Sequence, residues 1–345
     1  MSLARAIATG DLAELPSRRD EDWRWTDLRG LIRAMPAASP GGRARPRDQR
    51  WNGLADVEVG NTNGQGATDL DVPAGQQAFW IWRFMAVTAD SAHASEFFVD
   101  VGEDAKLTLV EMYEGFEPDY IRQVTAQFTI APGAKVERII VCEDTASAVT
   151  VSSATISLAA DSEFSQTVLT TGARRQRIET HVAHPGGGAS ARLDGVYLLD
   201  DQRHSDITTV VTHAGTNGTT DQLTKGVVGG QGRGVFQGRI VVEPGADQTD
   251  ARMGHHALLL SDRAEVDAKP ELEIFADDVA CAHGNTVGAL DEEALFYAEQ
   301  RGIPEADARA MLTEAFVAEV VDRIEHAGAR DVARAWVAAR LGGTQ

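Results

Sequence analysis

The chain has 345 residues, 43% of them hydrophobic, and its 32 basic and 52 acidic side chains give a formal net charge of −20. Length and apolar content are ordinary for a folded protein, and the negative charge disfavours nucleic acid and anionic membranes as partners. The two cysteines, Cys142 and Cys281, form no CxxC pair or secretory framework, and no segment approaches the ~18 apolar residues of a membrane span. We therefore expect a soluble cytoplasmic protein.

The first 50 residues are predicted to contain helices and a linker. Apolar residues at helical spacing begin with Leu3 and Ile7 and return between Trp23 and Ile32, behind the acidic segment SRRDEDW. The stretch MPAASPGGRARPRDQR then interrupts the pattern, and its prolines and glycines are typical of a linker. Residues 1–50 are therefore assigned to an N-terminal helical region and linker.

The middle of the chain has the composition of β-strands. From about Gln77 to Cys281 short runs are rich in Val, Ile, Thr and Phe, such as KLTLVEM, KVERIIVCED and GVFQGRIVV. Similar turn-and-strand segments begin at Pro132 and Pro185, and a repeat of roughly 26 residues fits the stacked coils of a β-solenoid. A two-sheet sandwich is the alternative, although ~200 residues without a helix is long for one sandwich. We predict a mainly β fold with a β-solenoid favoured for the core over residues 51–285.

Helical periodicity returns in residues 286–345, which are assigned to a C-terminal helical domain. Asp291 is placed to cap a helix that ends near Gly302 and Pro304. A last helix is expected after Asp331 and aligns Val332 with Trp336 and Ala339. Between them a second helix is predicted to bury one apolar stripe against its own domain, with a partner-binding face as the alternative: Ala308, Met311, Leu312, Ala315, Phe316 and Val320.

One cysteine lies two residues before a histidine in ADDVACAHG, as Cys281 and His283. In an extended strand these two side chains share a face. Thiolate and imidazole are suitable ligands for iron or zinc, but two ligands do not complete a tetrahedral site, so a stable metal needs other donors. A packed cysteine beside a hydrogen-bonded histidine is the alternative, and the pattern alone leaves both open.

Other histidines are weaker candidates. His255 and His256 are adjacent, so on a strand they point to opposite faces and cannot chelate one ion as a pair. His204 and Asp206 share a face if their segment is extended, and His213 supplies a further imidazole. We expect these histidines to be surface residues.

Several enzyme signatures are missing from the sequence. No P-loop is present, and the glycine-rich segment GGQGRGVFQG leads into a predicted strand, whereas a dinucleotide fingerprint opens a helix. The sequence also has no G-x-S-x-G elbow and no HExxH motif. The sequence therefore shows no organised hydrolase signature.

Two long segments resemble the SufB/SufD family of SUF iron-sulfur cluster assembly scaffolds. The region from Leu223 to Ile303, which contains KPELEIFADDV and FYAEQRGI, is similar to the family almost throughout, and PSRRDEDWRWTDL resembles its N-terminal segment. The motif ADDVACAHG favours the SufD branch over the SufB branch. The resemblance implies a right-handed parallel β-helix between N-terminal and C-terminal helical regions.

The resemblance also implies partners and a site. It implies a non-catalytic scaffold subunit that binds SufB through the β-helix end and the ATPase SufC through the C-terminal helices. Whether a homodimer forms in the absence of SufB is left open. The family's interface histidine maps onto His283, with Cys281 beside it. These two residues are then expected to contact a transient iron-sulfur cluster or iron, with His283 as the metal ligand and no cofactor stably bound.

Two alternatives of other classes remain. A stand-alone metal-binding protein would use His204, His213, His255 and His283. A β-helix enzyme that acts on carbohydrate would need the tryptophans of FWIWRF exposed beside a pair of carboxylates.

Overall fold

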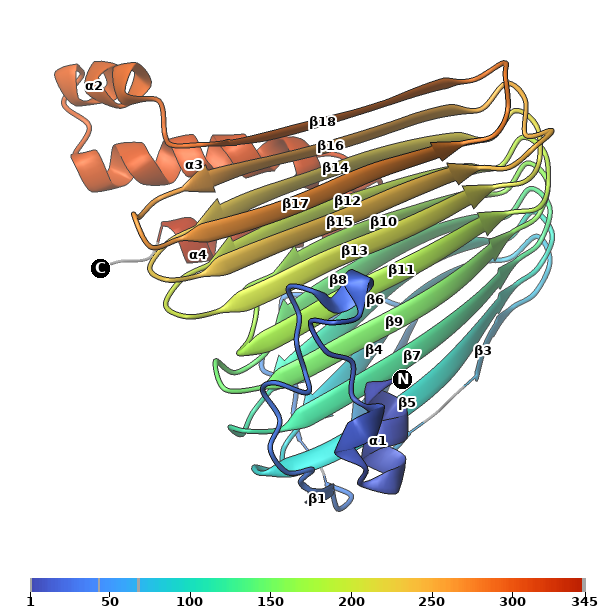
Figure 1. The fold of residues 1–345 in the computed structure, drawn as a ribbon, viewed down its shortest axis with the longest axis horizontal. Helices are drawn as coiled ribbons and strands as arrows, with labels where there is room; N and C mark the ends of the chain where they lie inside the picture. The colour runs from blue at the N-terminus through green and yellow to red at the C-terminus, as the bar shows by residue number, and fades with distance from the viewer. Residues whose placement is uncertain (1, 43, 67–68, 343–345) are drawn as a thin grey trace.

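The computed structural model describes residues 2–42, 44–66 and 69–342, which form a parallel β-solenoid flanked by helices (Figure 1). Odd-numbered strands make one sheet, here called the odd sheet, and even-numbered strands make the facing even sheet. The odd sheet contains β1 (Ala37–Ala38), β3 (Asp69–Val72), β5 (Ser91–Val101), β7 (Ile121–Ile130), β9 (Val149–Leu158), β11 (Arg175–His184), β13 (His204–His213), β15 (Arg233–Val242) and β17 (Glu265–Ile274). The even sheet contains β2 (Val57–Thr62), β4 (Gln77–Ala86), β6 (Lys106–Gly115), β8 (Lys135–Glu143), β10 (Glu163–Thr170), β12 (Ser190–Leu199), β14 (Thr219–Val228), β16 (Asp250–Leu259) and β18 (Ala280–Gly288). The predicted mainly β fold with a parallel β-helix core is confirmed.

The coils are longer and less regular than the sequence suggested. Glu163 pairs with Ser190, 27 positions later, whereas Thr219 pairs with Asp250, 31 positions later. The predicted repeat of roughly 26 residues was therefore too short. The spacing varies because the turns vary in length, from residues 159–162 between β9 and β10 to residues 243–249 between β15 and β16.

The core lies between the two sheets. Leu109, Val124 and Ile140 belong to one cluster of buried side chains that runs along the solenoid, and Trp82 stacks with Phe84 near its N-terminal end at a ring distance of 5.6 Å. The strands have nearly continuous apolar runs because both their faces are covered over much of their length, as is usual for parallel sheets. The N-terminal segment and the C-terminal helices cover the outer faces of the two sheets.

The N-terminal segment covers the outer face of the odd sheet with α1 (Leu3–Thr9) and two short 3-10 helices, η1 (Leu12–Glu14) and η2 (Glu21–Trp23). The helical spacing predicted from Trp23 to Ile32 is wrong, because this stretch forms turns. Side chains of the odd sheet hold it in that shape: His204 bonds to the carbonyl of Trp25, and Asp206 accepts from Thr26 Oγ1. These contacts take the place of the hydrogen bonds that a helix makes within itself.

The C-terminal helices are α2 (Glu292–Gln300), α3 (Glu305–Val321) and α4 (Ala327–Leu341), and the predicted cap at Asp291 is confirmed by its bonds to two backbone N–H groups. The last helix starts earlier than predicted, because His326 caps it. Helices α3 and α4 pack on the outer face of the even sheet. No helix among the described residues is long and apolar enough to cross a bilayer.

The predicted stripe on α3 is only partly right. Ala308 and Val320 are buried as expected, but Met311 is 56% exposed. The other residues that α3 buries against the sheet are Val317 and Val321. The prediction treated the whole helix as packed, whereas its second half carries this apolar contact with the even sheet. The first half of α3 and most of α2 therefore keep apolar side chains exposed.

Candidate functional site

The last coil of the solenoid is left open. Most side chains of β17 and β18 are half-buried or exposed, because no further coil covers them (Figure 1). The Ala280 N–H donates to the carbonyl of Thr249, just before the paired strand β16. The alternation of a parallel ladder then turns toward the open edge the N–H groups of Cys281, His283, Asn285 and Val287. This end therefore exposes both unpaired backbone groups and part of the apolar interior.

Cys281 and His283 lie together on the inner face of β18. They pair with Ala251 and Met253, two buried members of the core cluster, so the prediction that they share a strand face is confirmed. Burial raises the pKa of the Cys281 thiol, which favours its neutral form. His283 is exposed and has no hydrogen-bond partner among the residues that the structure describes. Its ring nitrogens therefore make no hydrogen bond inside the described chain.

A hydrogen-bonded row of side chains ends beside His283. Tyr197 Oη lies 2.8 Å from His255 Nε2, and His255 Nδ1 lies 2.7 Å from Asn285 Oδ1. The His255 ring is also stacked on Phe236 at a centroid distance of 4.9 Å. Sequence reasoning missed Tyr197 and Asn285, which lie 58 and 30 positions from His255. A coil repeat of the correct length would have placed His255 next to Asn285 from the sequence.

The neighbouring histidine faces the other way. His256 Nδ1 lies 2.6 Å from Thr286 Oγ1, on the opposite side of the even sheet from His255 and Asn285. The prediction that His255 and His256 point to opposite faces is confirmed, and they cannot share one metal ion as a pair.

The prediction that the remaining histidines are surface residues is wrong. His204 is buried under the N-terminal segment on the outer face of the odd sheet, where it shares a strand face with Asp206 as expected. His213 is buried inside the solenoid against His184, with ring centroids 4.3 Å apart, and His255 is also buried. Burial lowers the pKa of His204, His213 and His255 to about 4 in each case. The N-terminal segment covers His204, and the two sheets enclose His213 and His255.

The candidate metal ligands do not converge. Among the described residues, no group of three or more His, Cys, Asp or Glu side chains is placed to hold a metal ion. The open end offers one imidazole and one thiol, at His283 and Cys281, which are two of the four ligands that a tetrahedral site needs. The described residues alone therefore do not complete a metal site there.

The tryptophans that a carbohydrate site would need are not presented on a surface. Trp82 is 1% exposed and packs in the core against Phe84 and Phe97. Trp80 is only partly exposed and packs against the same cluster. The condition set for a carbohydrate-active enzyme is therefore not met by this segment.

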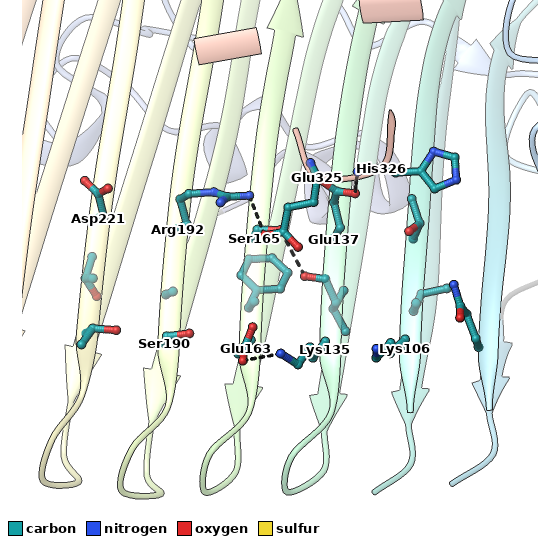
Figure 2. A pocket seen from close by; sticks show the side chains of 18 of the residues that line it. Lys106, Lys135, Glu137, Glu163, Ser165, Ser190, Arg192, Asp221, Glu325 and His326 are labelled. Carbon is teal, nitrogen blue, oxygen red and sulfur yellow. Dashed lines mark hydrogen bonds and ion pairs between the residues drawn. The ribbon is translucent and has the colours of Figure 1, made fainter. Parts of the chain in front are cut away.

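A groove of about 700 Å³ lies elsewhere, on the even sheet beside the α3–α4 connection (Figure 2). Its charged groups largely satisfy one another: Lys135 pairs with Glu163 at 2.6 Å, and Arg192 pairs with Glu325 at 3.0 Å. Glu137 accepts hydrogen bonds from two backbone N–H groups of the connection, and burial raises its pKa. These contacts anchor the start of α4 to the sheet, so the groove is a weaker candidate than the open end.

Comparison with known proteins agrees with this geometry. Residues 84–316 match the family described as SUF system FeS cluster assembly, SufBD core domain. The chain is 29% identical to the iron-sulfur cluster assembly protein SufD of Escherichia coli, over 99% of this chain and 92% of that protein. It is also 29% identical to the chloroplast protein ABCI7 of Arabidopsis thaliana, over 79% of this chain and 60% of that protein. A SufBD family protein of Mycobacterium leprae, ML0594, is 27% identical over 91% of this chain and 87% of its own length.

Proposed function

The chain belongs to the SufBD family of iron-sulfur cluster assembly proteins, and from this premise we propose that it is a non-catalytic scaffold subunit which acts with SufB and the ATPase SufC. Its role is to supply an interface and a ligand for a cluster in assembly. The observation that carries the proposal is the open last coil, with His283 exposed on it.

The open end has the properties of a surface that pairs with another solenoid. Its edge strands are long, and an uncovered edge of this kind is a template for strand addition. Large apolar side chains are exposed on or directly beside the last coil: Leu260, Ile274, Phe275 and Val287. A SufB solenoid that continues the two sheets satisfies the free backbone groups and covers these side chains.

His283 lies between the two chains in such a complex. Its imidazole has no bond to another described residue, so it is free to bind iron or a nascent cluster whose remaining ligands come from SufB. Cys281, on the same face, is the second cluster-facing residue, and metal binding is expected to displace its proton. An incomplete ligand set within one chain suits a cluster that must later leave.

The C-terminal helices carry the proposed contact with SufC. Phe296 and Tyr297 on α2 are each 61% exposed, and Met311 on α3 is exposed beyond the face that packs on the even sheet. Exposed aromatic and methionine side chains are enriched at the centre of protein interfaces. These three residues are therefore the proposed anchor for SufC.

The test uses this chain purified in complex with SufB and SufC. His283→Ala is expected to leave the complex intact and to lower its iron and sulfide content after anaerobic reconstitution by about tenfold, because one ligand is lost from a large interface. His181→Ala, which changes an exposed histidine on the odd sheet, is the control and is expected to reconstitute normally. A normal cluster content in an intact His283→Ala complex contradicts the proposal.

A further inference from the structure

The row formed by Tyr197, His255 and Asn285 connects the solenoid interior to its open end. Tyr197 on β12 and His255 on β16 are fully buried, whereas Asn285 on β18 is exposed. The three side chains are joined by the hydrogen bonds of 2.8 Å and 2.7 Å given above. A buried polar row of this kind fixes the direction of each hydrogen bond, because each proton needs an acceptor.

The hydroxyl of Tyr197 decides which atom is the donor and which the acceptor in each hydrogen bond of the row. Its hydroxyl is buried, and His255 Nε2 is its only hydrogen-bond partner among the described residues, so the hydroxyl proton is donated to that nitrogen. Burial lowers the pKa of His255 to about 4, so near pH 7 the ring is neutral and carries one proton. With Nε2 acting as the acceptor, this proton is on Nδ1 and is donated to Asn285 Oδ1.

This direction determines what Asn285 presents to the outside. Its carbonyl oxygen is held by His255, so its NH2 group is left to face the open end. Asn285 and His283 lie on the same strand face, two residues and about 7 Å apart along β18. The donor of Asn285 and the imidazole of His283 therefore border the same space.

We propose that Asn285 is a further ligand-contacting residue of this site, whose NH2 group donates hydrogen bonds to the sulfide or thiolate sulfur of a cluster held at His283, and that Tyr197 and His255 are positioning residues which fix the Asn285 amide. The inference rests on the proposed function of the open end. Hydrogen bonds to cluster sulfurs stabilise their negative charge and raise the reduction potential. The row therefore tunes how firmly the scaffold holds a cluster.

The first arm of the test uses the isolated chain, labelled with ¹⁵N-histidine, and records which ring nitrogen of His255 carries the proton at pH 7. We expect the proton on Nδ1 in the wild-type chain, and a change in the Nε2 resonance in Tyr197→Phe, which removes only the hydroxyl donor. His256→Gln, on the other face of the same strand, is the matched control and is expected to leave the His255 signals unchanged. Protonation of Nε2 in the wild-type chain overturns the proposed direction.

The second arm uses the reconstituted complex with SufB and SufC. Asn285→Asp keeps an acceptor for His255 but has no outward donor, and the neutral Asn285→Ala separates the lost donor from the added charge. Both variants are expected to lose their cluster to a chelator about tenfold faster than wild type and to have a more negative cluster potential, whereas His256→Gln matches wild type.

The two arms separate this inference from the function on which it rests. If His283→Ala lowers cluster content but both Asn285 variants behave as wild type, the role of Asn285 is wrong and the proposed function stands. If His283→Ala has no effect in an intact complex, the proposed function fails, whatever the His255 proton position in the isolated chain.

Discussion

The two ends of the solenoid finish in different ways. At the N-terminal end the outermost strands are short, with two residues in β1, four in β3 and six in β2. At the C-terminal end, β17 and β18 have ten and nine residues and lie uncovered. Short edge strands are one way in which proteins prevent strand addition, whereas a long uncovered edge invites it. The C-terminal end is therefore the end with a long uncovered edge, and it is the one that we propose as the pairing surface.

The inner face of the even sheet shows the same contrast in its side chains. Following the register from coil to coil, the position held by Trp82 in β4 is held by Asn285 in β18. The position of Trp80 leads in the same way to His283. Buried aromatic side chains at the start of the solenoid thus give way to exposed polar side chains at its end.

The largest effect is expected for Trp82→Ala, when it is compared with Asn285→Ala at the equivalent inner position of the last coil. Trp82 is buried among aromatic rings, so its removal is expected to lower the free energy of unfolding by about 3–5 kcal/mol. Asn285 is exposed but accepts a hydrogen bond from the buried His255, so its replacement is expected to lower that free energy by only about 1 kcal/mol. Urea unfolding measures both, and similar losses in the two variants would show that the ends do not differ as described.

The second expected effect is a loss of folding stability in acid, caused by a histidine buried in the solenoid interior. Burial lowers the pKa of His213 from 6.5 to about 4, so below pH 6.5 the unfolded chain binds a proton that the folded chain does not. Stability is therefore expected to fall as the pH drops from 6.5 toward 4, by about 3 kcal/mol for this residue. Urea unfolding of His213→Gln across this range should show a shallower pH dependence than that of the wild-type chain. Equal slopes for wild type and His213→Gln would contradict the assignment.

The third expected effect comes from removing one hydrogen-bond donor of the open edge. The N–H of Val287 points away from β16, so Val287→Pro removes a donor that the isolated chain does not use. We expect SufB binding to weaken roughly tenfold to a hundredfold, since one ladder hydrogen bond is lost and a carbonyl of the partner is left unsatisfied. Val287→Thr keeps the N–H and should bind normally. Calorimetric titration with SufB measures both affinities, and normal binding by a folded Val287→Pro chain would exclude strand addition at this point.

The smallest expected effect separates the two proposed partners. Phe296→Ala on α2 is expected to weaken SufC binding by about tenfold and to leave SufB binding unchanged, because this exposed ring lies outside the last coil. Phe98→Ala, at a less exposed phenylalanine on β5, is the control. Pull-down of each partner by both variants tests the assignment. Equal loss of SufB and SufC by Phe296→Ala would show that α2 is not a separate docking surface.

Patterns that depend on near neighbours were predictable from the sequence. The strand-rich middle of the chain, the cap at Asp291 and the shared face of Cys281 and His283 all follow from alternation or from capping chemistry within a few residues. The opposite orientations of His255 and His256 follow in the same way. Such features need no knowledge of how distant segments pack.

Features set by distant segments were not predictable in this way. The turns after Trp23 and the burial of His204 depend on contacts between residues about 180 positions apart. The exposed position of Met311 depends on how far α3 extends over the even sheet. The bond from His255 to Asn285 requires the register of the last coil, which varies with turn length. In a solenoid the pairing of one coil with the next decides these contacts.

The most direct test of the account is hydrogen exchange at the two ends of the solenoid, measured with and without SufB. The amides of Cys281, His283, Asn285 and Val287 face the open edge, so they are expected to exchange rapidly in the isolated chain and to become protected when SufB is added. The amides of β2 at the other end should exchange at the same rate in both samples. Protection confined to β2, or no added protection along β18 in a complex known to have formed, would contradict the claim that the open end is the pairing surface.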